Sequence, residues 1–176
     1  MRGAMSRGLF VGRFQPFHYG HYRALRWILE REDEVVLAIG SAQYSHSINN
    51  PFTLGERLEM IWLFLREEGL LDRVIMVGVP DTDGVHSMWV QQVLSLAPRF
   101  DRVYSNDPLT VRLFREAGFE VVRIPFFNRD RYRATKIREM MIRGDNWEEL
   151  VPRVISEYIK KIDGVSRLRD IYHLSD

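Results

Sequence analysis

The sequence predicts an α/β domain built on a doubly wound, mainly parallel sheet of five to six strands with helices on both faces. Two observations support this fold class. Short apolar runs recur along the chain, and the first three are continuous rather than alternating, as in strands covered on both faces. Stretches with apolar residues at helical spacing separate these runs, and an alternation of strand and helix favours a parallel sheet with right-handed crossovers.

Five strands are expected, over residues 8–12, 35–40, 74–79, 102–105 and 120–124. Helices are expected between them, where apolar side chains share one face, over residues 22–31, 54–67, 89–96 and 109–115. A further helix should begin at Thr135, and a helical tail should cover about residues 147–174 with a break near Gly164. Thr53 with Glu56, and Asp107 before Pro108, are typical of helix starts. This order corresponds to a Rossmann-like fold.

Length and composition indicate one domain over residues 1–176. Apolar residues make up 45% of the 176 residues and charged residues 28%, which is ordinary for a globular chain. The absence of cysteine excludes disulfides and thiolate metal sites. A net charge of +1 does not favour nucleic acid as a partner. No segment has the pattern of a membrane span or a signal peptide, so we expect a cytoplasmic protein with no membrane partner.

The segment GRFQPFHYGH, residues 12–21, is the first candidate site. It follows the first expected strand, and ligands of open parallel sheets bind beyond the carboxyl ends of the strands. A helix begins here, so its free N–H groups and positive dipole end favour an anion. His18 and His21 lie on one turn, and each can donate a hydrogen bond to a phosphate oxygen. Gly12 and Gly20 lack a Cβ, which would leave room for a ligand.

The two histidines could also have a different role. A zinc site requires three or four protein ligands, and the remaining histidines, at 46, 86 and 173, form no HExxH pattern with them. The pair could instead lie on the surface or cap the helix. The segment is neither the Walker phosphate loop nor GxGxxG.

The block GRFQPFHYGH resembles the HxGH signature of the nucleotidylyltransferase superfamily, and its flanks are similar to the archaeal type of nicotinamide-nucleotide adenylyltransferase. The resemblance covers about residues 8–145. It implies that ATP and nicotinamide mononucleotide are joined to give NAD and pyrophosphate. It also implies Mg²⁺, or a similar divalent cation, held mainly by substrate phosphates rather than by protein ligands. Relatives of this type are homo-oligomers, so we expect an oligomer, with a hexamer favoured.

The segment RDRYRATKIREMM, residues 129–141, is the second candidate site. A solvated basic face is one interpretation of its many cations. If Thr135 caps the helix, an anion there would instead meet free N–H groups, the helix dipole and the Arg138 guanidinium. Residues 133–138 also resemble the second signature of the superfamily, Ser-x-Thr-x-x-Arg, with Arg133 in place of the serine.

The resemblance implies a role for each candidate residue. The phosphates and the transferred group would be bound by His18, His21, Arg13 and Arg138. ATP would also contact Phe10, Val11, Gly12, Gly20, Arg133, Thr135 and Ile137. The nicotinamide nucleotide would contact Gln15, Ser41, Asn49, Asp81, Trp89 and Phe127.

Some of these roles have alternatives. Trp89 could stack on the nicotinamide ring or belong to the core face of its helix. Asp81 could bind substrate or form a turn, and Phe127 could simply pack. Asn49 stands where the archaeal pattern SIRDPF has an arginine.

Two other functions are compatible with these motifs. A related nucleotidylyltransferase would use another acceptor, such as phosphopantetheine, and a non-catalytic sensor would bind nucleotide without releasing pyrophosphate. A nucleic-acid-binding role would need a broader basic stripe than residues 129–143.

Overall fold

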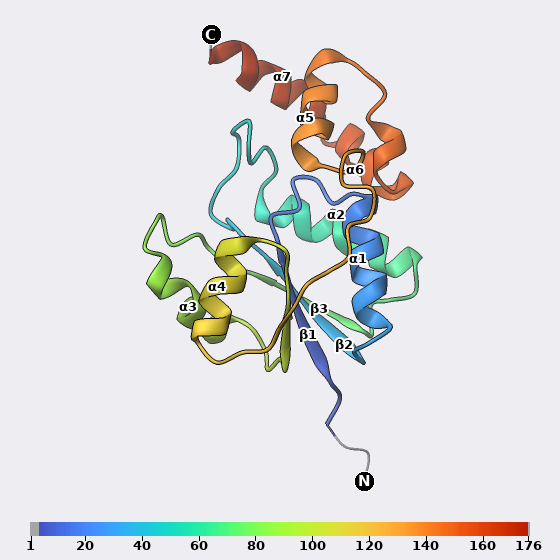
Figure 1. Cartoon of the computed structure of the whole chain (residues 1–176). Coiled ribbons are helices and arrows are strands. Elements are labelled where there is room, and N and C mark those ends of the chain that lie inside the picture. Colours follow the sequence, from blue (N-terminus) through green and yellow to red (C-terminus); the bar gives the residue numbers. More distant parts are fainter. Residues whose placement is uncertain (1–3, 176) are drawn as a thin grey trace.

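A parallel sheet forms the centre of the computed structural model, which describes residues 4–175 (Figure 1). Its strands are β1 (Arg7–Gly12), β2 (Glu34–Ile39), β3 (Val74–Gly78), β4 (Arg102–Tyr104) and β5 (Val121–Val122). They lie in the order β3-β2-β1-β4-β5, and every neighbouring pair is parallel. The chain therefore winds in one direction from β1 to β3 and in the other from β4 to β5, which makes the β1/β4 boundary the switch point.

Helices cover both faces of this sheet. They are α1 (Tyr19–Leu29), α2 (Leu54–Glu67), α3 (Trp89–Leu96), α4 (Pro108–Glu116), α5 (Ala134–Arg143), α6 (Arg153–Lys161) and α7 (Gly164–Leu174), with short 3₁₀ turns at His86–Met88 and Glu148–Leu150. Figure 1 shows α5, α6 and α7 at the end of the molecule toward which the strands run. None of the described helices is long and apolar enough to cross a membrane.

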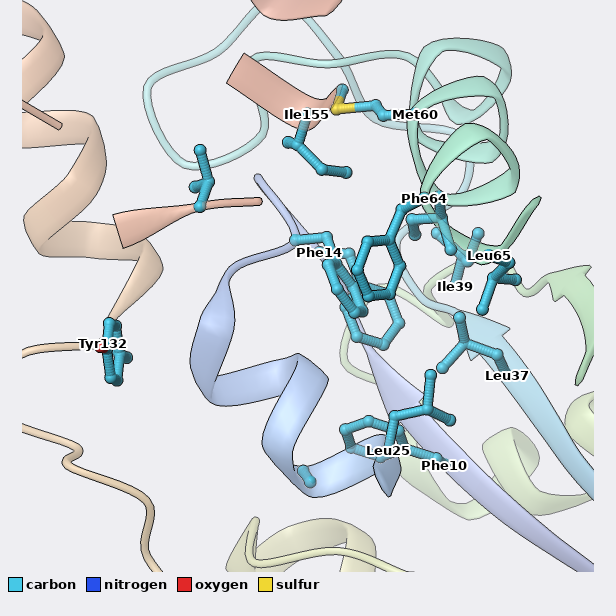
Figure 2. Packing of buried hydrophobic residues seen from close by; sticks show 14 of the residues in the cluster. Phe10, Phe14, Leu25, Leu37, Ile39, Met60, Phe64, Leu65, Tyr132 and Ile155 are labelled. Atoms are coloured by element: carbon cyan, nitrogen blue, oxygen red, sulfur yellow. The ribbon is translucent and has the colours of Figure 1, made fainter. Parts of the chain in front are cut away.

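Alternate residues of the central strands enter two separate cores. Phe10 and Leu37 point toward α1 and α2, where Figure 2 shows them packed with Leu25. Leu9 and Val36 point the other way and pack with residues of α3 and α4. Burial on both faces explains why these strands are apolar without alternation.

The predicted fold class is confirmed, and each expected element is present. The last strand is shorter than expected, and α1 begins three residues earlier because His18 acts as its N-cap. The expected start of the helix at Thr135 was wrong. It begins at Ala134 with Arg133 in the N-cap position, and no side chain caps it. Thr135 therefore lies inside the first turn.

Candidate functional site

Two cavities flank the carboxyl end of β1 and share part of their walls. The larger, about 460 Å³, lies beside the loops that follow β1, β2 and β3. The smaller, about 360 Å³, lies between the start of α1, the segment that follows β5 and the start of α5. Val11, Gly12 and Asp107 line both. A ligand with two large groups joined by a narrow link could therefore place one group in each cavity.

His18 and His21 stand at the start of α1 and line the smaller cavity. The backbone N–H of His21 donates to Nδ1 of His18 at 3.4 Å, and the N–H of His18 donates to Nδ1 of His21 at 3.1 Å. Their rings stack with centroids 3.6 Å apart. The helix-capping interpretation of this pair is thus correct. Since each Nδ1 accepts, the proton of each neutral ring is on Nε2, where it can be donated to a ligand.

Burial keeps both imidazoles neutral. It lowers the pKa of His18 to about 3 from the ordinary value of 6.5. Burial, together with the neighbouring His18, also lowers the pKa of His21 well below its ordinary value. The two rings therefore act as neutral hydrogen-bond donors at pH 7, and any positive charge at this site comes from other groups.

Two buried arginines supply that charge. Arg138 is 3% exposed and donates through Nη1 to the carbonyl of Gln15 at 2.9 Å and through Nη2 to Oγ1 of Thr135 at 3.4 Å. Arg57 is fully buried and donates to the carbonyls of Arg13 and Gly40 at 2.9 and 2.8 Å. Among the ion pairs of residues 4–175, neither has a carboxylate partner.

Burial, and then the nearby Arg13, lower the pKa of Arg57 and of Arg138 to about 10, so both stay charged at pH 7. A buried charge without a counter-ion is costly unless a ligand neutralises it. Arg13, Arg57 and Arg138 therefore form a positive cluster around the loop that follows β1, and this cluster favours a polyanion.

Arg57 is absent from the site residues that the sequence predicts. Its position held a usable signal, because Arg57 lies one helical turn before Ile61 on the buried face of α2. A charged residue on the apolar face of an amphipathic helix needs a polar partner or a function. Arg57 has four backbone carbonyls as partners, those of Arg13, Gly40, Ser41 and Thr53.

Most residues expected to contact ATP come together at the smaller cavity. Its walls include Phe10, Val11, Gly12, Gly20, Arg133 and Thr135. Ile137 does not belong to these walls, because it is fully buried in the core. Arg138 lies behind the walls and reaches them through its contact with Thr135.

The two glycines differ from expectation in what fills the space beside them. A Cβ on Gly20 would lie 2.9 Å from the ring of His18, and a Cβ on Gly12 would lie 2.8 Å from the ring of Phe14. The missing side chains therefore make room for neighbouring rings of the protein rather than for a ligand alone.

The residues expected to contact the nicotinamide nucleotide are divided. Ser41, Asp81 and Trp89 line the larger cavity with Arg13. Trp89 also packs edge-to-face on Phe114, with ring centroids 5.5 Å apart, so it belongs to both the cavity wall and the core of its helix.

The other three residues lie elsewhere. Phe127 lines the smaller cavity instead of the larger one. Asn49 is exposed and outside both walls. Gln15 is 1% exposed, and its amide exchanges two hydrogen bonds of 2.9 Å with the backbone of Phe52. Gln15 thus joins two loops instead of facing a cavity.

The fold and the site define the nucleotidylyltransferase class: a parallel sheet, an HxGH helix start, and a positive cluster at the switch point. Residues 9–140 match the family model described as cytidylyltransferase-like. The chain is 47% identical over 168 residues to a nicotinamide-nucleotide adenylyltransferase of Saccharolobus solfataricus, covering 95% of this chain and 97% of the relative. It is 49% identical over 167 residues to that of Methanosarcina mazei, covering 95% of each. The chain belongs to the nicotinamide-nucleotide adenylyltransferase family.

A solved structure agrees on the fold. The bifunctional NMN adenylyltransferase/ADP ribose pyrophosphatase of Francisella tularensis superposes with a TM-score of 0.78 at 22% identity. The match covers 95% of this chain and 53% of that one.

Proposed function

We propose that this chain transfers the adenylyl group of ATP to nicotinamide mononucleotide, forming NAD and pyrophosphate. The observation that carries the proposal is the pair of cavities that meet at the end of β1, beside two imidazole donors and a positive cluster. The names of the relatives, at 47 to 49% identity over almost the whole chain, support the same reaction.

The reaction requires an in-line displacement. A phosphate oxygen of the mononucleotide attacks the α-phosphorus of ATP, and the bond from that phosphorus to the oxygen that bridges the α- and β-phosphates breaks. The electron pair of this bond leaves on pyrophosphate. The attacking group is already ionised near pH 7, since its second pKa is about 6, so no protein base is needed. The protein must bring two polyanions together and stabilise the charge that moves onto the leaving group.

His18 and His21 would donate from Nε2 to oxygens of the α- and β-phosphates, at the positive end of α1. Their neutral state suits this task, because a ring that stays neutral keeps its one proton on Nε2 and gives the same hydrogen bond over a wide pH range. Arg138 would attract the β- and γ-phosphates from behind Thr135, and Arg13 would neutralise charge at the larger cavity.

The larger cavity would hold the mononucleotide. The indole of Trp89 offers a flat, electron-rich face to the cationic pyridinium ring. Asp81 and Asp107 place carboxylates in the same wall, which complements a positive ring. The smaller cavity would hold the adenosine half of ATP, near Phe10 and the Ile124–Phe127 segment.

A divalent cation fits this site only as an ion carried by the substrate. The described residues contain no cluster of three or more His, Asp or Glu side chains that could hold a metal. Mg²⁺ binds readily with substrate phosphates and water as most of its ligands. When bound, it would neutralise phosphate charge; the chain's own residues orient the phosphates.

The test is a direct assay. Protein, ATP, Mg²⁺ and nicotinamide mononucleotide are mixed, and NAD is detected by its reduction with alcohol dehydrogenase and ethanol while pyrophosphate is measured separately. We expect both products in equal amounts. Nucleotide binding without pyrophosphate release would instead support a sensor, and product formation only with phosphopantetheine would support a different acceptor.

A further inference from the structure

The C-terminal helix α7 is joined to the start of α2 by a partly buried ion pair. Nη1 and Nη2 of Arg167 donate to the two carboxylate oxygens of Glu56 at 2.6 and 2.9 Å, and Nη1 also donates to the carbonyl of Pro51 at 3.1 Å. The two side chains are only 21% and 15% exposed. A bidentate pair with this burial has a better defined geometry than an exposed single contact.

A second contact of α7 reaches the same segment. Gly164 is the first residue of the helix, and a Cβ at this position would lie 2.8 Å from the ring of Phe52. Phe52 is fully buried. The first turn of α7 therefore packs directly on the segment 51–56, to which Arg167 is also bound.

Hydrogen bonds also join this segment and the residue after it to the loops beside the larger cavity. The backbone of Phe52 exchanges two hydrogen bonds with Gln15, in the loop that follows β1. Arg57, which follows Glu56, donates to the carbonyls of Arg13, Gly40 and Ser41. Those three residues line the larger cavity, whereas no residue of α7 lines it or the smaller one.

We propose that Arg167 is a positioning residue for the mononucleotide site. Its ion pair with Glu56 holds α7 against segment 51–57. Through Arg57, this segment in turn holds the backbone of Arg13, Gly40 and Ser41 at the cavity wall. The identity of the ligand in this cavity rests on the proposed function, but the link between α7 and the wall does not. We call this link, formed by Arg167, Glu56 and segment 51–57, the clamp.

The expected consequence is kinetic as well as structural. When a supporting contact is lost, binding groups lose their alignment, and a small displacement far from the reacting atoms can reduce the rate by a large factor. Because the clamp holds the wall of one cavity, the KM for the mononucleotide should change more than the KM for ATP.

The test compares Arg167→Met with Arg167→Lys and with the control Arg153→Met. Arg153 forms an exposed pair with Glu157 on α6, so its loss should change nothing. We expect Arg167→Met to raise the KM for nicotinamide mononucleotide about tenfold, with the KM for ATP changed less than about twofold. Arg167→Lys keeps the charge but not the bidentate contact, so its KM should be intermediate.

Hydrogen exchange without substrate gives the second readout. Arg167→Met should increase amide exchange within residues 41–53 well below its melting temperature, while the control matches the wild type. A lower melting temperature with unchanged KM values and unchanged exchange in this segment would overturn the proposal and leave Arg167 a purely structural role. The exchange result stands even if the wild type forms no NAD, so it separates this proposal from the proposed function.

A double-mutant cycle completes the test and remains usable if Arg167→Met does not fold. Glu56→Gln keeps an acceptor for the N–H of Thr53, which Glu56 binds at 2.9 Å, but removes the charge. Adding Arg167→Lys to Glu56→Gln should raise the KM little further, because both changes break one interaction. Fully additive effects would contradict the clamp.

Discussion

His18 and His21 cap each other's backbone at the start of α1, with N–H to Nδ1 distances of 3.1 and 3.4 Å. One nitrogen of each ring is thereby used by the helix, and Nε2–H stays available at the cavity that both rings line. Capping and ligand binding are therefore two compatible roles of the same side chains rather than alternatives. The cap also fixes the tautomer, because only an unprotonated Nδ1 can accept.

The first prediction concerns this tautomer. In the free protein at pH 7, His18 and His21 should both be neutral with the proton on Nε2, and both should remain so at pH 5 because burial lowers their pKa. Long-range proton–nitrogen NMR of the imidazole rings measures this directly. Detection of protonated Nδ1 in either ring at pH 6 would contradict the reciprocal cap.

The second prediction is a pH dependence of stability. The pKa of folded His18 is about 3, while the unfolded chain has the ordinary 6.5. Between these values the unfolded state binds a proton that the folded state does not. The free energy of unfolding therefore keeps the full stabilisation by the neutral His18 ring above pH 6.5, and it falls as the pH decreases from 6.5 toward 3. His18→Asn keeps an N-cap acceptor without this titration. Urea unfolding measures how much the free energy of unfolding falls from pH 7 to pH 5, and this fall should be about 2 kcal/mol smaller in the variant than in the wild type. Equal losses would contradict the buried neutral ring.

The third prediction separates the cap from the chemistry at His21. His21→Gln retains a side-chain acceptor for the N–H of His18, whereas His21→Ala does not. His21→Ala loses the Nε2–H donor as well and should lose about a hundredfold or more in turnover, whereas the glutamine amide still has an N–H to donate, so His21→Gln should lose less. Only the alanine variant should also lose about 1 kcal/mol of stability. Steady-state kinetics and urea unfolding provide the two measurements, and turnover above about a tenth of wild type in His21→Ala would refute the donor role.

The sequence was sufficient for the order and type of the elements. Burial on both faces leaves continuous apolar runs, and Thr53 and Asp107 cap α2 and α4 as their spacing predicts. The start of α5 was less accessible, because Arg133 occupies its N-cap without a side-chain bond. A cap of this kind has no local signature.

The site was predictable where its residues belong to contiguous motifs, as at His18 and Thr135. It was not predictable where partners are distant in the chain. Arg57 binds carbonyls as far as 44 residues away, and Arg167 binds Glu56 across 111 residues. From sequence alone, a buried arginine on a helix cannot be distinguished from a solvent-exposed arginine, because its partners lie elsewhere in the chain. Phe127 lines a different cavity from Trp89, with which the sequence grouped it, because the cavity that a loop faces depends on the path of the chain and not on spacing.

The fourth prediction concerns the unpaired charge of Arg138. A bound triphosphate would supply the counter-ion that the described part of the protein lacks, so ATP should raise the melting temperature of the wild type. Arg138→Met should weaken ATP binding about tenfold or more, because it removes the buried positive charge and the hydrogen bond that orients Thr135 at the cavity wall. The control is Arg143→Met on the same helix, where Arg143 pairs with Asp145 and is 60% exposed. Thermal shift with increasing ATP measures binding to both variants. If the melting temperature of Arg138→Met responds to ATP as the wild type does, Arg138 has no role in binding ATP.

The last prediction tests which cavity holds which substrate. Trp89 lines the larger cavity, and a desolvated cation–π contact contributes about 2 kcal/mol. Trp89→Ala should therefore raise the KM for nicotinamide mononucleotide by roughly thirtyfold, with little change in the KM for ATP. Trp89→Phe, which retains an aromatic face and a ring to pack on Phe114, should have a smaller effect. Trp62→Ala is the matched control, because Trp62 is 38% exposed on α2 and lines neither cavity. Equal increases in the two KM values of Trp89→Ala would show that Trp89 supports the fold of the whole site, and an increase in the KM for ATP alone would show that the assignment of the mononucleotide to the larger cavity is wrong.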